Sequence, residues 1–561
     1  IIAPLLNLSY MSHLSKIFEE APVKVQNKNG FDLSHLRVGS AKCGQMVPVM
    51  AKLLPPNTDF TLGVNLQCNL PPLATSFFGR IDAIVEGFVV PCSILYGGWK
   101  QFISNQQFTQ FPATQSAIGA VGYDLPYFDL GNIQTIGTFA ADYASNDNLF
   151  EMLGGRSGVA ISGNPFEVSL LPFLAYHLIW DTYYRNKQIT RTIFAVNPNH
   201  QSAQINSKNV SLIWHSFYSS QASAYSPSFS SLAEMQFPDG LPFWHTRQRN
   251  YARDYFTAAT PSPQQGNASR LSFTTAAAGT DSSFTIASLR AANALQKFLE
   301  TNNLSGDYAE MMRNRWGTRP IDADFDEPYY LGRVIVPVYQ KSVYQQDSSA
   351  GSGATNPFAA QGAIGVKGAS GGFSGQGSIC GKFHNTTWAY VMCLFSLVPH
   401  ALYGYGINRE LTMLSIGDFP APELQTIGNE GIHDWEIFGT VNSTTDPSLV
   451  QEFGYIPRYS HFKYMLDEVS GELRPGKTLD SFVLQRDFSS QPQLSTAFLE
   501  IGQTDLDSVF AVSTANMNLS CWFEIFFEFK VSMPLADFCI PTLGDIQDTH
   551  TIKSSVGGSR L

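Results

Sequence analysis

The feature that most limits how this chain can fold is a stretch near its C-terminal end, residues 521–531, in which apolar residues recur at every second position. Every second position is apolar, and Glu524, Glu528 and Lys530 lie between the apolar positions; the apolar set is Cys521, Phe523, Ile525, Phe527, Phe529 and Val531. Successive side chains of a strand point to opposite faces, so the pattern predicts a strand with one face in a core. We therefore expect a central strand of an antiparallel sheet that packs against a second layer.

The composition of the chain extends this expectation to most of its length. Only 14% of the 561 residues are charged and 13% are aromatic, while Gly and Pro number 45 and 31. Such a chain is poor in helix-surface residues and rich in turn formers, which is typical of a loop-heavy β protein. We predict an N-terminal arm over residues 1–30 and one elaborated domain over 31–561, with variable loops at 197–240 and 345–378, where Ser, Gly, Gln and Asn dominate.

Residues 169–185, SLLPFLAYHLIWDTYYR, form the strongest helical segment. Ser169 suits the N-cap, Pro172 falls within the first turn, and Arg185 suits the C-terminal end. The predicted helix is apolar on nearly all sides, so other parts of the protein must cover several of its faces.

His177 and Asp181 are the clearly polar residues of this helix, and they are four positions apart. This spacing allows a catalytic His–Asp dyad. A buried polar pair whose hydrogen bonds are satisfied is the favoured interpretation, because no nucleophile stands beside it and burial normally forces such pairing.

Other elements follow from shorter patterns. Strands are predicted within residues 80–91, 333–344 and 479–488, and helices over 288–299 and 307–316. Long loops between many short strands favour a sandwich with Greek-key or jelly-roll connections.

Charge and cysteine content exclude several classes of protein. A formal net charge of −11 argues against a surface that binds nucleic acid throughout, although local basic patches remain possible. The seven cysteines contain no C-x-x-C pair, so neither a disulfide framework nor a thiolate zinc site is indicated, and a reducing compartment is expected. The N-terminus lacks the features of a signal peptide, and the uncharged stretch 385–408 is broken by Pro399 and Gly404, so a soluble protein is expected.

Catalytic and metal motifs have little support. The G-x-S-x-G match at residues 368–372 lies in a Gly-rich tract without the strand and helix of a nucleophile elbow, and we interpret it as coincidence. Asp322, Asp324 and Asp326 imitate the start of a calcium loop, but Glu327 replaces the required Gly. This excludes an EF-hand and leaves a looser cation site open. No enzymatic activity, cofactor or metal site is predicted.

Arginines interleaved with aromatic residues are the one pattern that favours a ligand. Residues 245–256, HTRQRNYARDYF, and a second cluster further on supply the candidate nucleic-acid-binding residues Arg247, Arg249, Tyr251, Arg253, Arg313 and Arg315. Guanidinium groups bind phosphates while aromatic rings stack on unpaired bases, which suits single-stranded DNA. The alternative, which we favour, is ion pairing at an interface with Asp254, Glu310 or carboxylates of a neighbouring subunit.

The order of several motifs resembles the major capsid protein of Microviridae, small icosahedral single-stranded DNA bacteriophages, and most closely its gokushovirus-like branch. The matching segments are FDLSHL (31–36), MVPV (46–49), LPPNTDF (54–60), IDAIVEGFVVPCSILYGGWKQF (81–102), LPFLAYHLIWDTYYRN (171–186), ARDYFTAATPSPQQG (252–266), LQKFLETNN (295–303), YAEMMRNRWGTRPIDADFDEPYYLG (308–332), EFGYIPRYSHFKY (452–464), SGEL (470–473) and LDSFVLQRDF (479–488). Gly87 and Cys92 depart from the family's pattern and affect only local packing.

This resemblance implies an all-β fold, an eight-stranded antiparallel viral jelly roll, that self-assembles into a T=1 icosahedral capsid around a circular single-stranded DNA genome. It further implies a location in the virion after assembly in the bacterial host cytoplasm. The implied partners are other copies of the chain, packaged single-stranded DNA, a small basic DNA-binding protein, a minor DNA pilot protein, a scaffolding protein and a host surface receptor. A secreted glycan-binding or glycan-cleaving β-sandwich is the alternative, and a pair of carboxylates facing an aromatic cleft would favour it.

Overall fold

The structure is a computed structural model of the whole chain. It describes residues 28–71, 77–95, 147–155, 167–190, 192–193, 241–264, 286–303, 327–345, 366–414, 416–439, 452–510 and 519–535, together with residues 73, 99, 103 and 127–129. The predicted loop 197–240, the predicted helix 307–316 and the three aspartates 322, 324 and 326 lie outside these residues.

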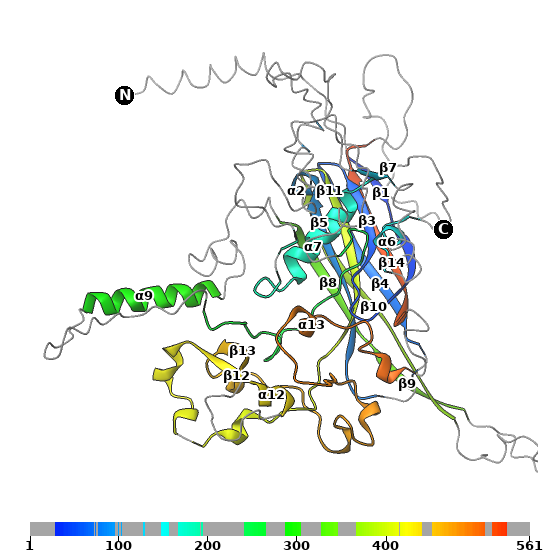
Figure 1. Cartoon of the computed structure of the whole chain (residues 1–561). Coiled ribbons are helices and arrows are strands. Elements are labelled where there is room, and N and C mark those ends of the chain that lie inside the picture. Colours follow the sequence, from blue (N-terminus) through cyan, green and yellow to red (C-terminus); the bar gives the residue numbers. More distant parts are fainter. Residues whose placement is uncertain are drawn as a thin grey trace, which may run out of the picture.

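Two antiparallel sheets pack face to face and form the centre of the molecule (Figure 1). One sheet has six strands, in which β1 and β2 both pair with β14: β1 (Asn29–Asp32), β2 (His35–Ala41), β14 (Cys521–Met533), β4 (Thr58–Asn69), β10 (Val366–Asn385) and β9 (Tyr339–Gln345). The other has four strands in the order β3 (Val47–Leu54), β11 (Ala389–Pro399), β5 (Ile81–Pro91) and β8 (Tyr329–Pro337).

The connections between these strands are those of a jelly roll. β1 and β2 follow one another along β14, and β8 continues into β9 after Val338 as the chain passes from one sheet to the other. With each interrupted strand counted once, the chain-order numbers run 1-8-3-6-5 in the six-stranded sheet, where β9, the continuation of β8, is the last, and 2-7-4-5 in the other. This order is the double Greek key expected of a viral jelly roll.

The alternating stretch near the C-terminus forms β14, and the prediction of a central core strand is confirmed. β14 pairs with β1 and β2 along one edge and with β4 along the other. Its odd-numbered residues from Cys521 to Met533 are buried, while Glu524, Glu528 and Lys530 face outward. The buried side chains meet those of β11 across the sandwich, where the rings of Phe395 and Phe523 lie 4.5 Å apart.

A helical layer covers the outer face of the four-stranded sheet. It comprises α2 (Cys92–Leu95), α6 (Leu149–Met152), α7 (Leu171–Ile179) and the π-helical turn η2 (Trp180–Tyr184). The predicted helix is therefore confirmed, although it begins two residues later than Ser169 and its last turn is widened. Phe88 and Met392 of the sheet pack against Leu174 and Tyr176 of α7, which explains why a helix apolar on most sides is stable here.

A third core lies at one end of the sandwich. It is built from β12 (Asn429–His433), β13 (Glu452–Pro457), α12 (Asp434–Phe438) and α13 (Thr496–Leu499), with Phe256 and Tyr403 among its buried side chains. Short 3-10 turns connect these elements: η6 (Arg409–Thr412), η7 (Ile416–Asp418), η8 (Pro422–Ile427), η10 (Ser460–Phe462), η11 (Gly471–Leu473), η12 (Asp480–Phe482) and η13 (Asp507–Val509).

The remaining elements are the short pair β6 (Tyr127–Asp129) and β7 (Glu167–Ser169) and the long helix α9 (Ile286–Asn303). α9 confirms the helix predicted over 288–299. Within the described part of the chain, no helix is both long enough and apolar enough to cross a bilayer.

Two predictions of secondary structure were wrong. Residues 479–488 do not form a strand; they begin with the 3-10 turn Asp480–Phe482, and their backbone then bonds to two separate partners, Phe78 and Leu402. The predicted loop 345–378 is strand β10 from Val366 onward, paired with β9 and β4. Its glycines weaken the local signal for a strand, but they let β10 approach β8 closely, since a Cβ atom on Gly377 would lie 2.7 Å from a methyl carbon of Val334.

His177 and Asp181 do not pair with each other, so that part of the prediction was wrong, although both are buried and satisfied. The Nε2–H of His177 donates to the Phe243 carbonyl (2.8 Å), and its Nδ1 accepts from Arg247 Nε (3.2 Å). Asp181 instead accepts from Ile193 N and Thr192 Oγ1 and pairs with Arg185. The two side chains therefore hold different loops against the helix.

Replacing Gly377 by Ala should destabilise the subunit by about 1–3 kcal/mol, because the added Cβ would overlap the γ-carbons of Val334 and β-branched side chains cannot easily move aside. Denaturant unfolding of the G377A subunit measures this. The matched control is G30A, since a Cβ on Gly30 meets no atom within 4 Å. Adding V334A to G377A should restore much of the loss, and equal stabilities of G377A and G30A would contradict the close packing.

The neutral His177 predicts a pH dependence of stability. Burial, and then the charge of Arg247, hold the pKa of His177 well below 6.5, whereas an unfolded histidine titrates near about 6.5. As the pH falls through that value, the histidine binds a proton in the unfolded chain but stays neutral in the folded chain. The free energy of unfolding therefore falls by about 2 kcal/mol between pH 7 and 5. Free energies of unfolding for wild type and His177→Gln over this range test it. The wild-type curve should fall more steeply, and parallel curves would contradict the assignment.

Candidate functional site

Residues 241–264 contain the arginine–aromatic pattern, and they run through the middle of the molecule rather than over its surface. Single β-bridges tie the segment to four separate parts of the chain, through the pairs His245–Asn148, Gln248–Gln45, Asn250–Glu500 and Thr260–Tyr455. It therefore links the helical layer to the third core, and its side chains enter both.

Arg247 lies inside the helical layer and is only 1% exposed. Its backbone N–H donates to the Tyr176 hydroxyl (2.8 Å), its Nε donates to His177, and its guanidinium carbon lies 4.7 Å from the centre of the Trp180 ring. All three partners belong to the helix predicted from residues 169–185. The arginine fixes that helix to the segment and presents no donor group to solvent.

Arg249 forms a buried ion pair with Glu86 of β5. Its Nη1 donates to Glu86 Oε2 (2.6 Å) and to Ser396 Oγ (2.9 Å), and its guanidinium covers the ring of Tyr184, whose hydroxyl also donates to Glu86. Burial acts to lower the pKa of Arg249, but the Glu86 carboxylate outweighs it and raises the pKa overall. The Arg249 guanidinium thus connects β5, β11 and the π-helical turn η2.

Tyr251 is 7% exposed and points toward the segment 502–505. Its hydroxyl donates to Asp505 Oδ2 (2.5 Å), and the guanidinium carbon of Arg486 lies 4.4 Å from the centre of its ring. Burial, reinforced by Asp505, holds its pKa well above 10. Arg486 therefore covers one face of the ring, and the side chain is too deeply buried to stack on a base.

These positions argue against the predicted DNA contacts of Arg247, Arg249 and Tyr251, because each side chain is already enclosed by its own chain. The alternative prediction, ion pairing at an interface, fits only Arg249. Its partner Glu86, however, belongs to the same subunit. Arg253 differs, since it is exposed on the far side of the segment. Arg313 and Arg315 lie outside the described residues, so contacts between DNA and these three arginines stay a prediction.

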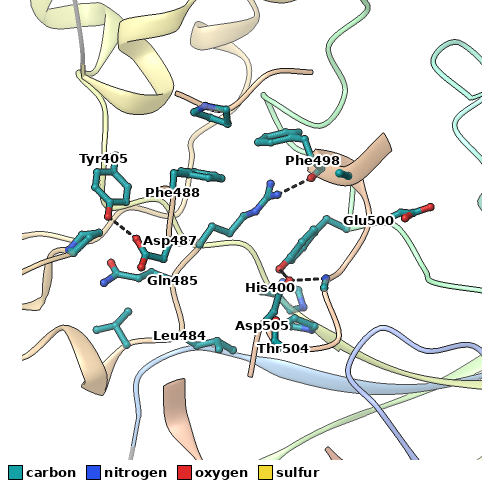
Figure 2. A pocket seen from close by; sticks show the side chains of 18 of the residues that line it. His400, Tyr405, Leu484, Gln485, Asp487, Phe488, Phe498, Glu500, Thr504 and Asp505 are labelled. Atoms are coloured by element: carbon teal, nitrogen blue, oxygen red, sulfur yellow. Dashed lines mark hydrogen bonds between the residues drawn. The ribbon is translucent and has the colours of Figure 1, made fainter. Parts of the chain in front are cut away.

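Tyr251 is among the residues that line a cleft of about 920 Å³ (Figure 2). Arg486 crosses it, with its guanidinium 4.2 Å from the ring centre of Phe498 and 5.3 Å from that of Phe488, and its Nη2 donates to the Phe498 carbonyl (2.6 Å). This cationic side chain fills an aromatic cage made by its own chain. Sequence reasoning missed it, because Tyr251 and Phe498 are far from Arg486 along the chain.

The acidic and aromatic lining of this cleft bears on the glycan alternative. Asp487 accepts from the Tyr405 hydroxyl (2.6 Å), and Asp505 accepts from Tyr251 and from the Gly502 N–H. Figure 2 shows Asp487 and Glu500 on opposite sides of the cleft, with Glu500 directed outward. The two aspartates brace the walls of the cleft, and the arrangement lacks a pair of carboxylates facing each other across an open groove.

A second charged cluster supports the third core. Arg409 Nη1 donates to Glu436 Oε1 (3.3 Å) and to the Gly431 carbonyl (3.0 Å), and its Nη2 lies 3.6 Å from Glu430. The Tyr255 hydroxyl donates to the other oxygen of Glu436. Among the described residues, no group of three or more His, Cys, Asp or Glu is placed to hold a metal ion. The buried charges of this chain thus serve to join its parts.

Comparison with known proteins agrees with this structural character. Residues 21–540 match the family described as capsid protein (F protein). The capsid protein VP1 of Chlamydia phage 1 is 22% identical over 636 aligned positions, which cover 94% of this chain and 97% of that protein. The capsid protein VP1 of Bdellovibrio phage phiMH2K is 22% identical over 520 positions, covering 87% of this chain and 90% of that protein.

The family match spans nearly the whole chain and includes both sheets of the jelly roll, the helical layer and the third core. The match argues against the glycan-binding or glycan-cleaving alternative, because the matching proteins are capsid proteins, which are structural components of virions and not enzymes. The chain belongs to the capsid protein (F protein) family and is a structural capsid protein of the virion.

Proposed function

We propose that this chain is the subunit of a small T=1 icosahedral shell that encloses a circular single-stranded DNA genome. The observation that carries the proposal is the family match over residues 21–540, together with the two phage capsid proteins that cover almost the whole chain. The jelly roll supplies a rigid wall element, and the long segments between its strands supply the contacts between subunits.

The physical design of the subunit supports this role. The sandwich buries its core without help from a partner, and Arg249 and Glu86 lock the helical layer onto it. By contrast, large apolar side chains are exposed on the connecting segments, among them Leu414, Ile416 and Met465. Exposed apolar surface on a well-ordered subunit is the property of a protein that associates.

DNA would be held by a limited set of side chains in this proposal. The net charge of −11 cannot balance a genome, so a small basic DNA-binding protein and counterions would supply most of the neutralisation. The exposed Arg253, with Arg313 and Arg315, would add local phosphate contacts. A minor DNA pilot protein, a scaffolding protein and a host surface receptor complete the proposed partners, and assembly would take place in the bacterial host cytoplasm.

Expression of the full chain should yield closed shells when the subunit concentration or the scaffolding partner permits assembly. Electron microscopy and sedimentation of the purified material measure this directly. A subunit that stays a protease-resistant monomer at high concentration, with and without co-expressed phage proteins, would contradict the proposed function.

Replacing Arg253 by Ala should leave shell formation unchanged and reduce the DNA retained per shell, with the difference shrinking at higher salt, because the variant makes one phosphate contact fewer and its binding depends less on counterion release. The matched control is Arg290→Ala, which removes another exposed arginine, on α9. Absorbance ratios of purified shells at increasing salt give the DNA content. Identical DNA content in both variants would remove Arg253 from the proposed interface.

Replacing Arg249 by Met should act on folding instead, because it leaves the Glu86 carboxylate buried without its cation. We expect a loss of about 3–5 kcal/mol in the free energy of unfolding, most of it recovered when Glu86→Gln is added. Denaturant unfolding of the two variants decides between the roles. A stable R249M subunit whose shells lack DNA would instead support the original prediction that Arg249 binds the genome.

A further inference from the structure

The two most exposed large apolar side chains of the described residues, Ile416 and Leu414, lie in one short segment beside the third core. It contains η6, η7 and η8 and lies at the end of the molecule away from the sheets, in yellow in Figure 1. Five large side chains point outward, and we call them the ridge: Leu411 (78% exposed), Leu414 (93%), Ile416 (95%), Phe419 (56%) and Ile427 (60%).

The ridge is held in place by hydrogen bonds of its own backbone. Asn408 Oδ1 accepts from Glu410 N (2.9 Å), the Leu414 N–H donates to Asp418 Oδ2 (3.0 Å), and the Ala421 N–H donates to the Tyr459 hydroxyl (3.4 Å). Arg409, at the start of the segment, is bound to Glu436 and Gly431 of the third core. The apolar side chains are thus presented by an anchored segment, so their exposure is a property of the fold.

A groove lies directly beside the ridge. It has a volume of about 530 Å³, and aromatic and aliphatic side chains line much of it, among them Phe256, Tyr403, Ile407, Leu411, Tyr464 and Met465. Leu411 belongs to both the ridge and the groove, and Met465, which also lines the groove, is 91% exposed. One face of the subunit therefore carries an apolar projection next to a depression whose lining is part apolar and part charged.

We propose that this face binds a second copy of the same chain, with the ridge of each copy in the groove of the other. A projection and a depression on one face are self-complementary under a two-fold rotation, which is the commonest symmetry between identical subunits. The inference rests on the proposed function, since an icosahedral shell requires two-fold contacts.

The size and charge of the face favour a second copy of the chain over DNA as the partner. Exposed side chains of this size offer roughly 100 Å² each, so the ridge with Met465, Tyr464 and Phe462 offers on the order of 800 Å², which is the share of one partner in a stable interface. Residues 410–427 carry three acidic side chains, Glu410, Asp418 and Glu423, and no Lys or Arg. The ridge therefore repels phosphates, while the groove beside it carries both signs of charge, with Arg409 and Arg474 among Glu410, Glu436 and Glu468.

The full-length variant Leu414→Ser with Ile416→Ser tests the proposal. Both side chains are almost fully exposed in the subunit, so its unfolding midpoint should not change. The threshold concentration for assembly should rise roughly tenfold or more, because burying even one large aliphatic side chain is worth about a tenfold change in affinity. The matched control, L414I with I416L, keeps the apolar surface and should assemble like wild type.

Chemical cross-linking gives a second readout that needs no loss of assembly. Subunits carrying I416C are mixed with subunits carrying M465C, allowed to assemble, and treated with a short bis-maleimide. Covalent dimers that contain both variants are expected. As a control, T61C on the outer face of β4 replaces M465C, and this pair should give no covalent dimers. The parent chain without added cysteines controls for cross-linking through the native cysteines.

If the wild-type chain forms shells and the serine variant has the same assembly threshold, the proposed face is wrong and the shell function stands. The same conclusion follows if the cysteine variants assemble but no I416C–M465C dimers form. Serine variants that assemble normally but no longer attach to host cells would also contradict the proposed contact between subunits. They would indicate that the ridge binds a host receptor. A wild-type chain that forms no oligomer under any condition would overturn the shell function and the ridge proposal together.

Discussion

The fold depends on the four-stranded sheet being buried on both faces. β5 is buried along its whole length and β11 along nearly all of it, so neither strand has a face that water can solvate. One face is covered by the six-stranded sheet, where Phe395 meets Phe523, and the other by α7. The helical layer therefore covers one face of the four-stranded sheet as the second sheet covers the other.

Charged side chains fasten the parts that hydrophobic packing alone would leave free to slide. Apolar contacts are non-directional, whereas the Arg249–Glu86 pair and the hydrogen bonds of Arg247 to α7 fix one arrangement. Arg409 and Glu436 do the same for the third core. A shell wall needs subunits of one defined shape, and buried ion pairs at the junctions between its layers give that definition.

The surface divides into regions with different physical demands. The outward face of β14 carries Glu524 and Glu528 beside the partly exposed rings of Trp522 and Phe526, while the ridge residues Leu414 and Ile416 are almost fully exposed on an anchored segment. The subunit thus combines a folded core with exposed apolar surface of the kind found on proteins that associate. Stability of the subunit and stability of the assembly then come from different residues, so each can change without the other.

Local patterns were sufficient to predict β14, β5 and the helix before Arg185, because apolar residues recur at strand or helical spacing over many residues there. The order of short motifs along the chain was sufficient to indicate the family and hence the jelly roll. Tertiary structure alone decided that β10 is a strand, since its glycines carry no hydrophobic signal and are selected by the closeness of β8. It also decided that Arg247 and Arg249 point into the protein, because their partners Tyr176, His177 and Glu86 lie far away in the sequence and burial is a property of the packed chain rather than of residue type.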